Sequence, residues 1–354
     1  ASDIDPHSTT TSTSNNLDVS KADQATVTVS APATLAYGGS GSAVASGGSG
    51  TGAYSYSAGA STACSVNAST GAITVTSGTG TCSITATKAG DSNYNTSAVS
   101  TPANVTITKA NQTITFGVLS DKTFVDAPFT VSATVSSPLT VSFGSQTPAV
   151  CSVSGSTVTI LDIGTCTIRA SQGGDANYSA APNVDQSFTV NPGPLHHFGI
   201  STIGTQTAGT SFSITITAQD TGNHTVTSFT GTVNLSTTAG SISPTVSGAF
   251  TSGVWTGSVT VTGAGTGKTI TATDPVSTKT GTSNTFTVNP GAATAFSVTA
   301  PSSAVAGNAI SITVTAKDQY NNTATGYTGT VHFTSTDGAA VLPADYTFAG
   351  GDNG

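Results

Sequence analysis

The hexapeptide FTVNPG occurs twice, at Phe188–Gly193 and at Phe286–Gly291, and opens a repeat that constrains the fold of the chain. At a constant offset of 98 residues, segments 188–237 and 286–335 are identical at 22 of 50 positions without a gap. The chain therefore contains at least two copies of one structural unit, and that unit is about as long as a small domain.

Alternation of apolar and hydroxyl side chains predicts strands within this unit. SITITAQD (213–220) and SITVTAKD (311–318) place Ile, Val and Ala at every second position, the pattern of a strand with one buried face. FTGTVNL (229–235) and YTGTVHF (327–333) alternate in the same way after turns rich in Asp, Gly and Asn. Short alternating strands in a unit of this length predict a β-sandwich of immunoglobulin type.

Composition extends the all-β prediction to the whole chain. Charged residues make up only 7%, Met is absent, and all 16 acidic residues are Asp. The residues that usually fill helix surfaces are thus scarce, while Thr and Val suit strands. We expect no long helix, and 354 residues leave room for three or four modules in a row.

The charge pattern argues against nucleic acid and membrane partners. The net charge is −8 with only 8 Lys and Arg, too few for a patch that neutralises a phosphate backbone. No apolar run reaches the length of a membrane span, and the first residues do not resemble a signal peptide. Any signal or anchor would lie outside this sequence.

Further internal similarity predicts the domain organisation. LDVSKADQ (17–24) resembles VTITKANQ (105–112), which lies where one module ends and the next begins. Leu17–Ala22 is thus expected to be the last strand of another domain, and positions 257–290 of the third module have no counterpart in the fourth. The predicted parts are a Ser/Thr-rich segment with this strand (1–22), modules 23–109, 110–192 and 193–290, and an incomplete module 291–354.

The first two modules share a cysteine-containing half. ACSV, GTCSITA and GDSNY in the first correspond to VCSV, GTCTIRA and GDANY in the second. The second module resembles the cysteine-containing immunoglobulin-like repeats of large secreted and cell-surface bacterial proteins. The third and fourth are similar to filamin-like repeats of such proteins. The resemblance implies an extracellular or surface location of bacterial type, and it implies no shared activity.

Four cysteines form one pair in each of the first two modules, and each pair brackets a predicted hairpin. We predict disulfides Cys64–Cys82 and Cys151–Cys166, with reduced buried thiols as the alternative. No CxxC motif or nearby His favours a metal or a nucleophile. Loops of this length predict a stabilisation of roughly 3 kcal/mol per disulfide, and disulfides indicate an oxidising compartment.

Aspartates and asparagines recur at equivalent turns, Asp220 with Asn223 and Asp318 with Asn321. One carboxylate and one amide fall short of the six to eight oxygens of a calcium site. We therefore interpret these residues as turn caps, and no metal site is predicted.

The two GDxNY turns receive the same interpretation. Asp91 and Asp175 are predicted caps, and Tyr94 and Tyr178 are predicted to hold a corner of each sandwich.

Two remaining candidates are also interpreted as structural. His196 and His197 are adjacent, so along a strand they would point in opposite directions and chelate poorly. Trp255, the only tryptophan, is expected to anchor a core rather than bind sugar. No GxSxG motif or paired carboxylate indicates catalysis, so neither enzyme activity nor a cofactor is predicted.

The sequence favours a structural role, a stiff extracellular stalk or filament of tandem sandwiches joined by short proline-containing junctions. Its expected partners are copies of itself, by strand addition or lateral packing, and the cell envelope. One alternative is a filament subunit in which Ser8–Ala22 donates a strand to the fourth module of a neighbour. Another is an adhesin that binds a host protein or glycan through end loops, for which the Gly/Ser-rich segment Gly38–Gly52 is the longest candidate.

Overall fold

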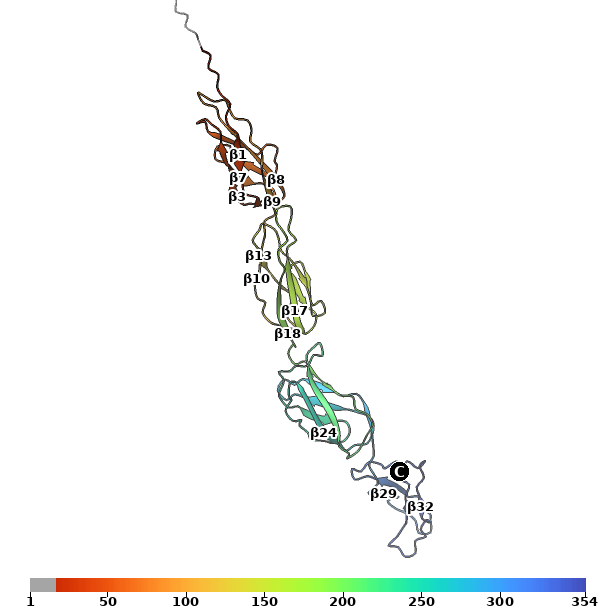
Figure 1. Ribbon diagram of the computed structural model, residues 1–354. Helices are drawn as coiled ribbons and strands as arrows, with labels where there is room; N and C mark the ends of the chain where they lie inside the picture. Colours follow the sequence, from red (N-terminus) through yellow and green to blue (C-terminus); the bar gives the residue numbers. More distant parts are fainter. Residues whose placement is uncertain (1–16) are drawn as a thin grey trace, which may run out of the picture.

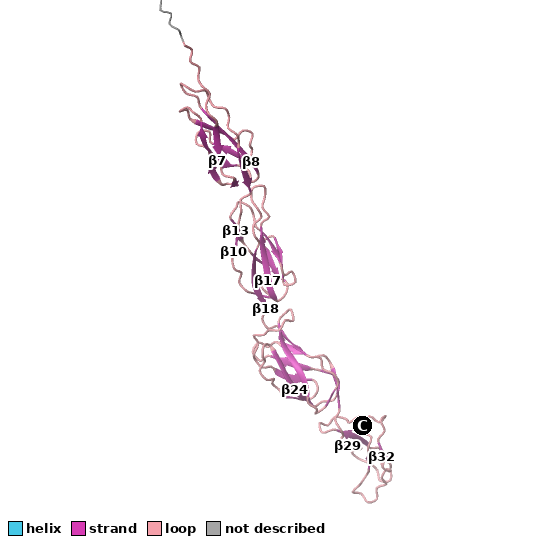
Figure 2. Ribbon diagram, viewed as in Figure 1, coloured by secondary structure: helices cyan, strands magenta, loops and turns pink. Residues whose placement is uncertain are grey.

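The computed structural model describes residues 17–354 as a row of β-sandwich units. Figure 1 shows the units following one another along an elongated chain, and Figure 2 shows strands and loops only. The described residues contain no helix, and so none that is long and apolar enough to cross a membrane. The chain is therefore all-β, a set of tandem immunoglobulin-like sandwiches, as the composition predicted.

The first module is built around a four-stranded sheet of order β2-β9-β8-β5, in which β2 runs parallel to β9. A three-stranded sheet, β3-β7-β6, and the pair β1-β4 complete it. Its core combines small and aliphatic side chains, among them Ile73, Ile84 and Val105. The strands are β1 (Val27–Ser30), β2 (Thr34–Ala36), β3 (Ser40–Ser42), β4 (Val44–Gly47), β5 (Tyr54–Ser57), β6 (Cys64–Val66), β7 (Ala72–Val75), β8 (Gly80–Lys88) and β9 (Ala103–Thr108).

The second module repeats this arrangement. Its sheets are β11-β18-β17-β14, β12-β16-β15 and the pair β10-β13, and β11 again runs parallel to the last strand. The strands are β10 (Ile114–Phe116), β11 (Lys122–Thr123), β12 (Phe129–Thr130), β13 (Ala133–Val135), β14 (Ser142–Ser145), β15 (Cys151–Ser154), β16 (Thr157–Ile160), β17 (Gly164–Ser171) and β18 (Val184–Asn191).

The third module has the largest buried core and needs no disulfide. Its sheets are β19-β21-β24-β23, β20-β28-β25 and β22-β26-β27. Phe198, Phe229 and Phe250 pack edge to face or tilted, with ring centroids 5.0–5.8 Å apart. The strands are β19 (His197–Ile200), β20 (Gln206–Thr207), β21 (Phe212–Gln219), β22 (Asn234–Thr237), β23 (Ile242–Ser243), β24 (Val254–Val261), β25 (Gly265–Lys268), β26 (Ile270–Thr273), β27 (Thr280–Thr282) and β28 (Phe286–Asn289).

The fourth module keeps the aromatic cluster of the third at the same offset of 98, as Phe296, Tyr327 and Phe348. Its strands form two pairs, β29 (Ala295–Thr299) with β30 (Thr313–Lys317) and β31 (Thr330–Val331) with β32 (Tyr346–Thr347). Ile312 is 36% exposed, whereas its counterpart Ile214 in β21 is 1% exposed, and β21 pairs with β24. An apolar face that is buried in the third module is thus open in the fourth.

Two predicted strands are shorter than the alternation suggested. In segment 229–235 only Asn234–Leu235, the start of β22, form a strand. In segment 327–333 only Thr330–Val331, which are β31, do so. The predicted inward positions are nevertheless buried, Val233 at 0% and Leu235 at 5% exposure. Side-chain burial therefore follows the alternation, while loop-like hydrogen bonds such as Phe250 N–H to the Gly231 carbonyl replace a regular ladder.

The Gly/Ser-rich segment Gly38–Gly52 is not the long end loop that the sequence suggested. It contains β3 and β4, which pair with β7 and β1. Ala43 and Ala45 are the buried positions, and Gly71 allows the close approach, because a Cβ there would lie 2.3 Å from the Ala43 carbonyl oxygen. Small residues here serve close packing, which local composition alone does not distinguish from flexibility.

Residues 1–16 of the predicted N-terminal segment lie outside the described part of the chain. Leu17–Lys21 are exposed and form no strand with any described residue, and only Ala22 makes a bridge, to Tyr94. The role of Leu17–Ala22 as the last strand of another domain therefore stays a prediction.

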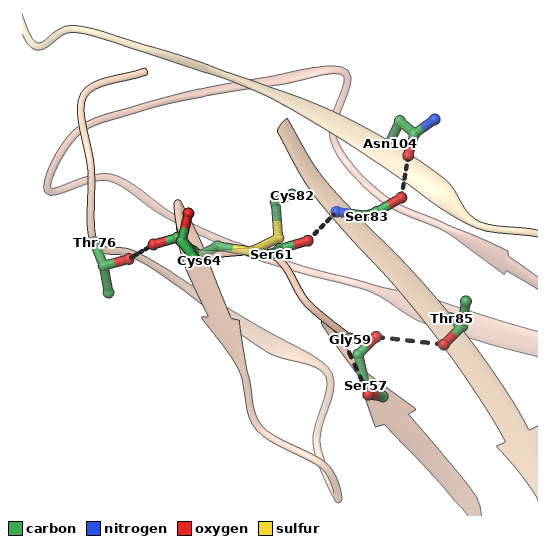
Figure 3. The surroundings of a disulfide bond; sticks show 10 residues. Ser57, Gly59, Ser61, Cys64, Thr76, Cys82, Ser83, Thr85 and Asn104 are labelled. Carbon is green, nitrogen blue, oxygen red and sulfur yellow. Dashed lines mark hydrogen bonds between the residues drawn. A yellow bond between two sulfur atoms is a disulfide. The ribbon is translucent and has the colours of Figure 1, made fainter. Parts of the chain in front are cut away.

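The structure links Cys64 to Cys82 and Cys151 to Cys166, with Cα–Cα distances of 5.7 and 5.8 Å. All four residues are at most 5% exposed and belong to the cores. Figure 3 shows Ser61 and Thr76 beside the first disulfide, where the Ser61 hydroxyl accepts from the Ser83 N–H at 2.9 Å. Each bridge joins the first strand of a hairpin, β6 or β15, to a central strand of the other sheet, β8 or β17, and so links two sheets.

Replacing Cys151 and Cys166 by alanine should destabilise the second module by about 3 kcal/mol, because the disulfide closes a loop with a sequence separation of 15. Urea unfolding followed by far-UV circular dichroism would measure the shift. Trp255 is the only tryptophan and lies in β24, so its fluorescence should report an unchanged third module. An unchanged circular dichroism profile would contradict the prediction.

Candidate functional site: the module junctions

The side chains singled out by the sequence do not form a catalytic or metal centre. Within residues 17–354 no three His, Cys, Asp or Glu side chains gather in a way that could hold a metal ion. The cysteines are buried in disulfides, and Trp255 is half-buried at the border of the third core, where its ring covers Gly248 and Gly257. The polar side chains that make contacts from one module to the next lie instead at the three junctions between modules.

His196 and His197 point toward each other rather than in opposite directions. Their Nδ1 atoms are 3.2 Å apart and their rings meet at 84°. The prediction was wrong because β19 begins only at His197, so His196 is not constrained by the pleat of the strand. No third ligand accompanies the pair among the described residues.

We call the end of a module nearer the N-terminal end of the chain its upper end and the opposite end its lower end. The GDANY turn (Gly174–Tyr178) forms the upper end of the second module, at the first junction, where the first and second modules meet. Asp175 Oδ1 accepts the backbone N–H groups of Asn177 and Tyr178 at 2.7 and 2.8 Å, which is the capping role predicted for it. Ala110, the residue that enters the module, donates its N–H to the Asn177 carbonyl and accepts from Ser179 N–H, both at 2.9 Å. The turn and the incoming chain are thus fixed together.

Asn177 and Tyr178 then contact the lower end of the first module. Asn177 Oδ1 accepts the N–H of Gly78 at 2.9 Å, and Tyr178 packs edge to face on Tyr37 with centroids 5.4 Å apart. Gly78 is buried, and a Cβ on it would lie 2.4 Å from the Ala176 carbonyl oxygen. Only glycine allows this turn to approach the loop so closely.

At the second junction, between the second and third modules, the side chain that crosses is the imidazole of His224, where the first junction uses the amide of Asn177. His224 of the third module places Nε2 at 2.8 Å from Asp162 Oδ1 of the second module and Nδ1 at 3.1 Å from Asp220 Oδ2. Its ring also meets Phe124 of the second module edge to face, with centroids 4.5 Å apart. His224 therefore joins two modules through one polar and one aromatic contact.

Asp220 organises the loop that presents His224. It is fully buried and accepts the backbone N–H groups of Gly193, Gly222 and His224 at 2.8–2.9 Å. Desolvation raises the pKa of this carboxyl, but the hydrogen bonds from Gly193 and His224 outweigh it, so its pKa lies below the ordinary value of 3.8. The carboxylate is thus the hydrogen-bonded hub of a junction loop.

The third junction repeats the second with different side chains. Asn322, which occupies the repeat position of His224, accepts the N–H of Ala264 at 3.0 Å and donates to the Thr262 carbonyl at 2.8 Å. Asp318 takes the role of Asp220, because it is buried and accepts from the N–H groups of Gly291 and Asn322. Tyr320 covers Gly209, where a Cβ would lie 2.5 Å from its ring.

All three junctions use the same two places on the upper module. One is the residue after the short strand that runs parallel to the last strand, and it contributes Tyr37 or Phe124, or Ala208 next to Gly209. The other is the turn just before a left-handed glycine that begins a strand, Gly80 (φ 114°), Gly164 (φ 122°) or Gly265 (φ 135°). A common construction thus connects modules of both sequence types.

Sequence reasoning identified the caps but missed the side chains that cross between modules. Asn177, His224 and Asn322 were not singled out, although the repeat alignment places His224 and Asn322 at equivalent positions. The signal in the sequence was that each of these three residues is polar and follows the capping aspartate by two or four positions. The prediction that Asn223 and Asn321 are caps was wrong, because among the described residues their side chains make no hydrogen bond. They instead supply left-handed backbone to the turns, with φ of 66° and 68°.

Substituting Gly78→Ala should loosen the first junction, because the added methyl group cannot fit against Ala176 and Asn177. The loss of one hydrogen bond worth about 0.5–1.5 kcal/mol should broaden the distribution of angles between the first two modules, so that bent particles become more frequent. Small-angle scattering would detect it as a reduced maximum dimension. Gly173→Ala, at a position with open space and no positive φ, should leave the scattering curve unchanged.

Substituting Asp220→Asn should destabilise the third module by about 1–3 kcal/mol, because an amide cannot accept all the hydrogen bonds of the carboxylate. A lowered pKa stabilises the fold above the ordinary value of 3.8, and this contribution is lost as the pH falls through the lower folded value. Urea unfolding read by Trp255 fluorescence at a series of pH values should show a stability difference that shrinks on acidification. A difference independent of pH would contradict this assignment.

Comparison with known proteins identifies no family for this chain. No protein-family model matches the chain, and no curated protein sequence matches it significantly. Similar solved structures include surface layer protein SbsC domains 1–6, at 15% identity and a TM-score of 0.26, covering 89% of this chain and 48% of that one. They also include three domains of titin, at 7% identity and a TM-score of 0.29, covering 75% and 97%. The chain spans about half the length of the surface-layer structure.

Proposed function

We propose that this chain forms a stiff stalk or filament outside the cell, and that it is a structural rather than a catalytic protein of bacterial surface type. The observation that carries the proposal is the set of three junctions, each locked by a buried loop carboxylate or a capped turn and by a side chain that crosses to the next module. Flexible linkers between binding domains would not need such contacts.

The chemistry of the surface supports this role. Cross-strand hydroxyl pairs, such as Thr215 with Thr256 at 2.9 Å and Thr271 with Thr282 at 3.1 Å, keep exposed faces polar with few charges. Such pairs do not depend on pH or salt as ion pairs do. Two disulfides in the first two modules favour an oxidising environment, which supports an extracellular location.

Electron microscopy of the purified chain tests the proposal. Straight rods with a narrow distribution of angles between modules are expected, and the double variant Gly78→Ala with His224→Ala should produce bent particles. Antibodies against the third module should label intact cells of the source organism. Freely jointed beads in the unaltered protein, or labelling only after lysis, would contradict the stalk.

The open face of the fourth module favours a second candidate, a filament subunit that polymerises by strand addition. Ile312, Val314, Val331 and Phe333 border a hollow of about 420 Å³. Among the described strands β30 pairs only with β29, whereas β21 in the third module pairs with both β19 and β24. An added strand with alternating apolar residues would fill the hollow. The donor considered, Ser8–Ala22, lies mostly outside the described residues.

Strand addition predicts fibres with an axial repeat at high protein concentration. Deleting residues 8–22 should abolish them if this segment is the donor. Rods of constant length at every protein concentration would contradict polymerisation by strand addition and would be consistent with a stalk that does not polymerise.

A further inference from the structure

We propose that the GDSNY turn of the first module, with Ala22, is a docking surface for another immunoglobulin-like module, whose last strand runs into Leu17–Ala22. The inference rests on the proposed function and extends it by naming the partner's class. It arises from a comparison of the two upper ends that this chain contains, at Asp91–Tyr94 and at Asp175–Tyr178.

The backbone of the two upper ends is the same. Ala22 bridges to Tyr94 in parallel as Ala110 bridges to Tyr178. Ala22 N–H donates to the Asn93 carbonyl at 3.0 Å and accepts from Asn95 N–H at 2.9 Å, as Ala110 does with Asn177 and Ser179. The incoming chain thus enters the first module along the path that it takes into the second.

The same side chains shape the two turns, and in the first module Asp91 Oδ2 also accepts the N–H and the hydroxyl of Thr51. Asp91 Oδ1 accepts the N–H groups of Asn93 and Tyr94, both at 2.9 Å, as Asp175 does in the second module. Hydrogen bonds from the backbone of Thr51, Asn93 and Tyr94 lower the pKa of Asp91 to about 2, so this cap stays ionised. Gln24 Nε2 donates to the Asn95 carbonyl at 2.9 Å, as Gln112 Nε2 donates to that of Ser179 at 2.7 Å.

The groups that cross the first junction have counterparts without a partner among the described residues. Asn177 accepts from Gly78, whereas the Asn93 side chain is exposed and makes no hydrogen bond. Tyr178 packs on Tyr37, but no aromatic ring packs on Tyr94. Lys109 Nζ donates to the Asp175 carbonyl, and Lys21 at the matching position is exposed. The turn is therefore built in the form that contacts a module.

The geometry specifies the kind of module. Its lower end must present a glycine whose N–H reaches Asn93 Oδ1 and an aromatic ring that reaches Tyr94, as Gly78 and Tyr37 do. A lower end of the second module's type does not fit, because Asp162 stands where the first module has Gly78, two residues before the left-handed glycine. A Cβ at that place would collide with the loop, as one on Gly78 would with Ala176. The partner is thus of the same class as residues 23–109.

Fusing a second copy of residues 23–108 to the chain directly before Lys21 tests this. Docking should slow tryptic cleavage of the Lys21–Ala22 bond at least about tenfold relative to the unfused chain, since protection follows the population of the open state. Asn93→Ala should remove most of this protection, and Ser92→Ala in the same turn should not. Only material in which the added copy carries its disulfide is compared.

The Lys109–Ala110 bond in the same digest separates two kinds of failure. If it is protected while Lys21–Ala22 is cut as fast as in the unfused chain, the docking proposal is wrong and the stalk survives. If both bonds are cut rapidly, the modules do not dock on one another and the proposed function fails as well. Protection of Lys21–Ala22 that is insensitive to Asn93→Ala would also overturn the assigned contact.

Discussion

The structure depends on hydrogen bonds that fix a turn at the upper end of each module before that turn contacts the module above. Asp175, Asp220 and Asp318 each accept backbone N–H groups of a loop, and a polar side chain two or four residues later in that loop crosses the junction. A carboxylate with several backbone donors holds a loop in one conformation. The entropy of ordering the loop is then lost on folding, so little remains to be lost when two modules dock.

Low charge and high hydroxyl content fit the same task. A row of modules exposes a large surface relative to its cores, and like charges spread along it would repel one another. Threonine and serine satisfy one another across strands, and a polar contact between His224 and Asp162 lies at a junction. The first two modules add disulfides, while the third relies on three packed phenylalanines. Either device stabilises its own module.

Much of the fold could be predicted because burial in a strand has a period of two. Ile214, Ile216 and Ala218 are buried as their alternation predicts, and each cysteine pair lies within one module. The strand ends of 229–235 could not be predicted, because hydrogen bonds with the segment around Gly248 replace a regular ladder there. Gly38–Gly52 was misinterpreted because small residues permit both flexibility and close packing, and only the approach of Gly71 to Ala43 shows which applies.

The sequence by itself determined the module type, the repeat and the identity of the caps, since these follow from local periodicity and from side chains that bond to their own turn. Only the tertiary structure decided which residues join the modules. Asn177 and Gly78 are 99 positions apart, and their contact requires two folded modules to meet end to end. Local patterns carry no record of such contacts, because the energy of a junction resides in pairs that come together only after each sandwich has closed.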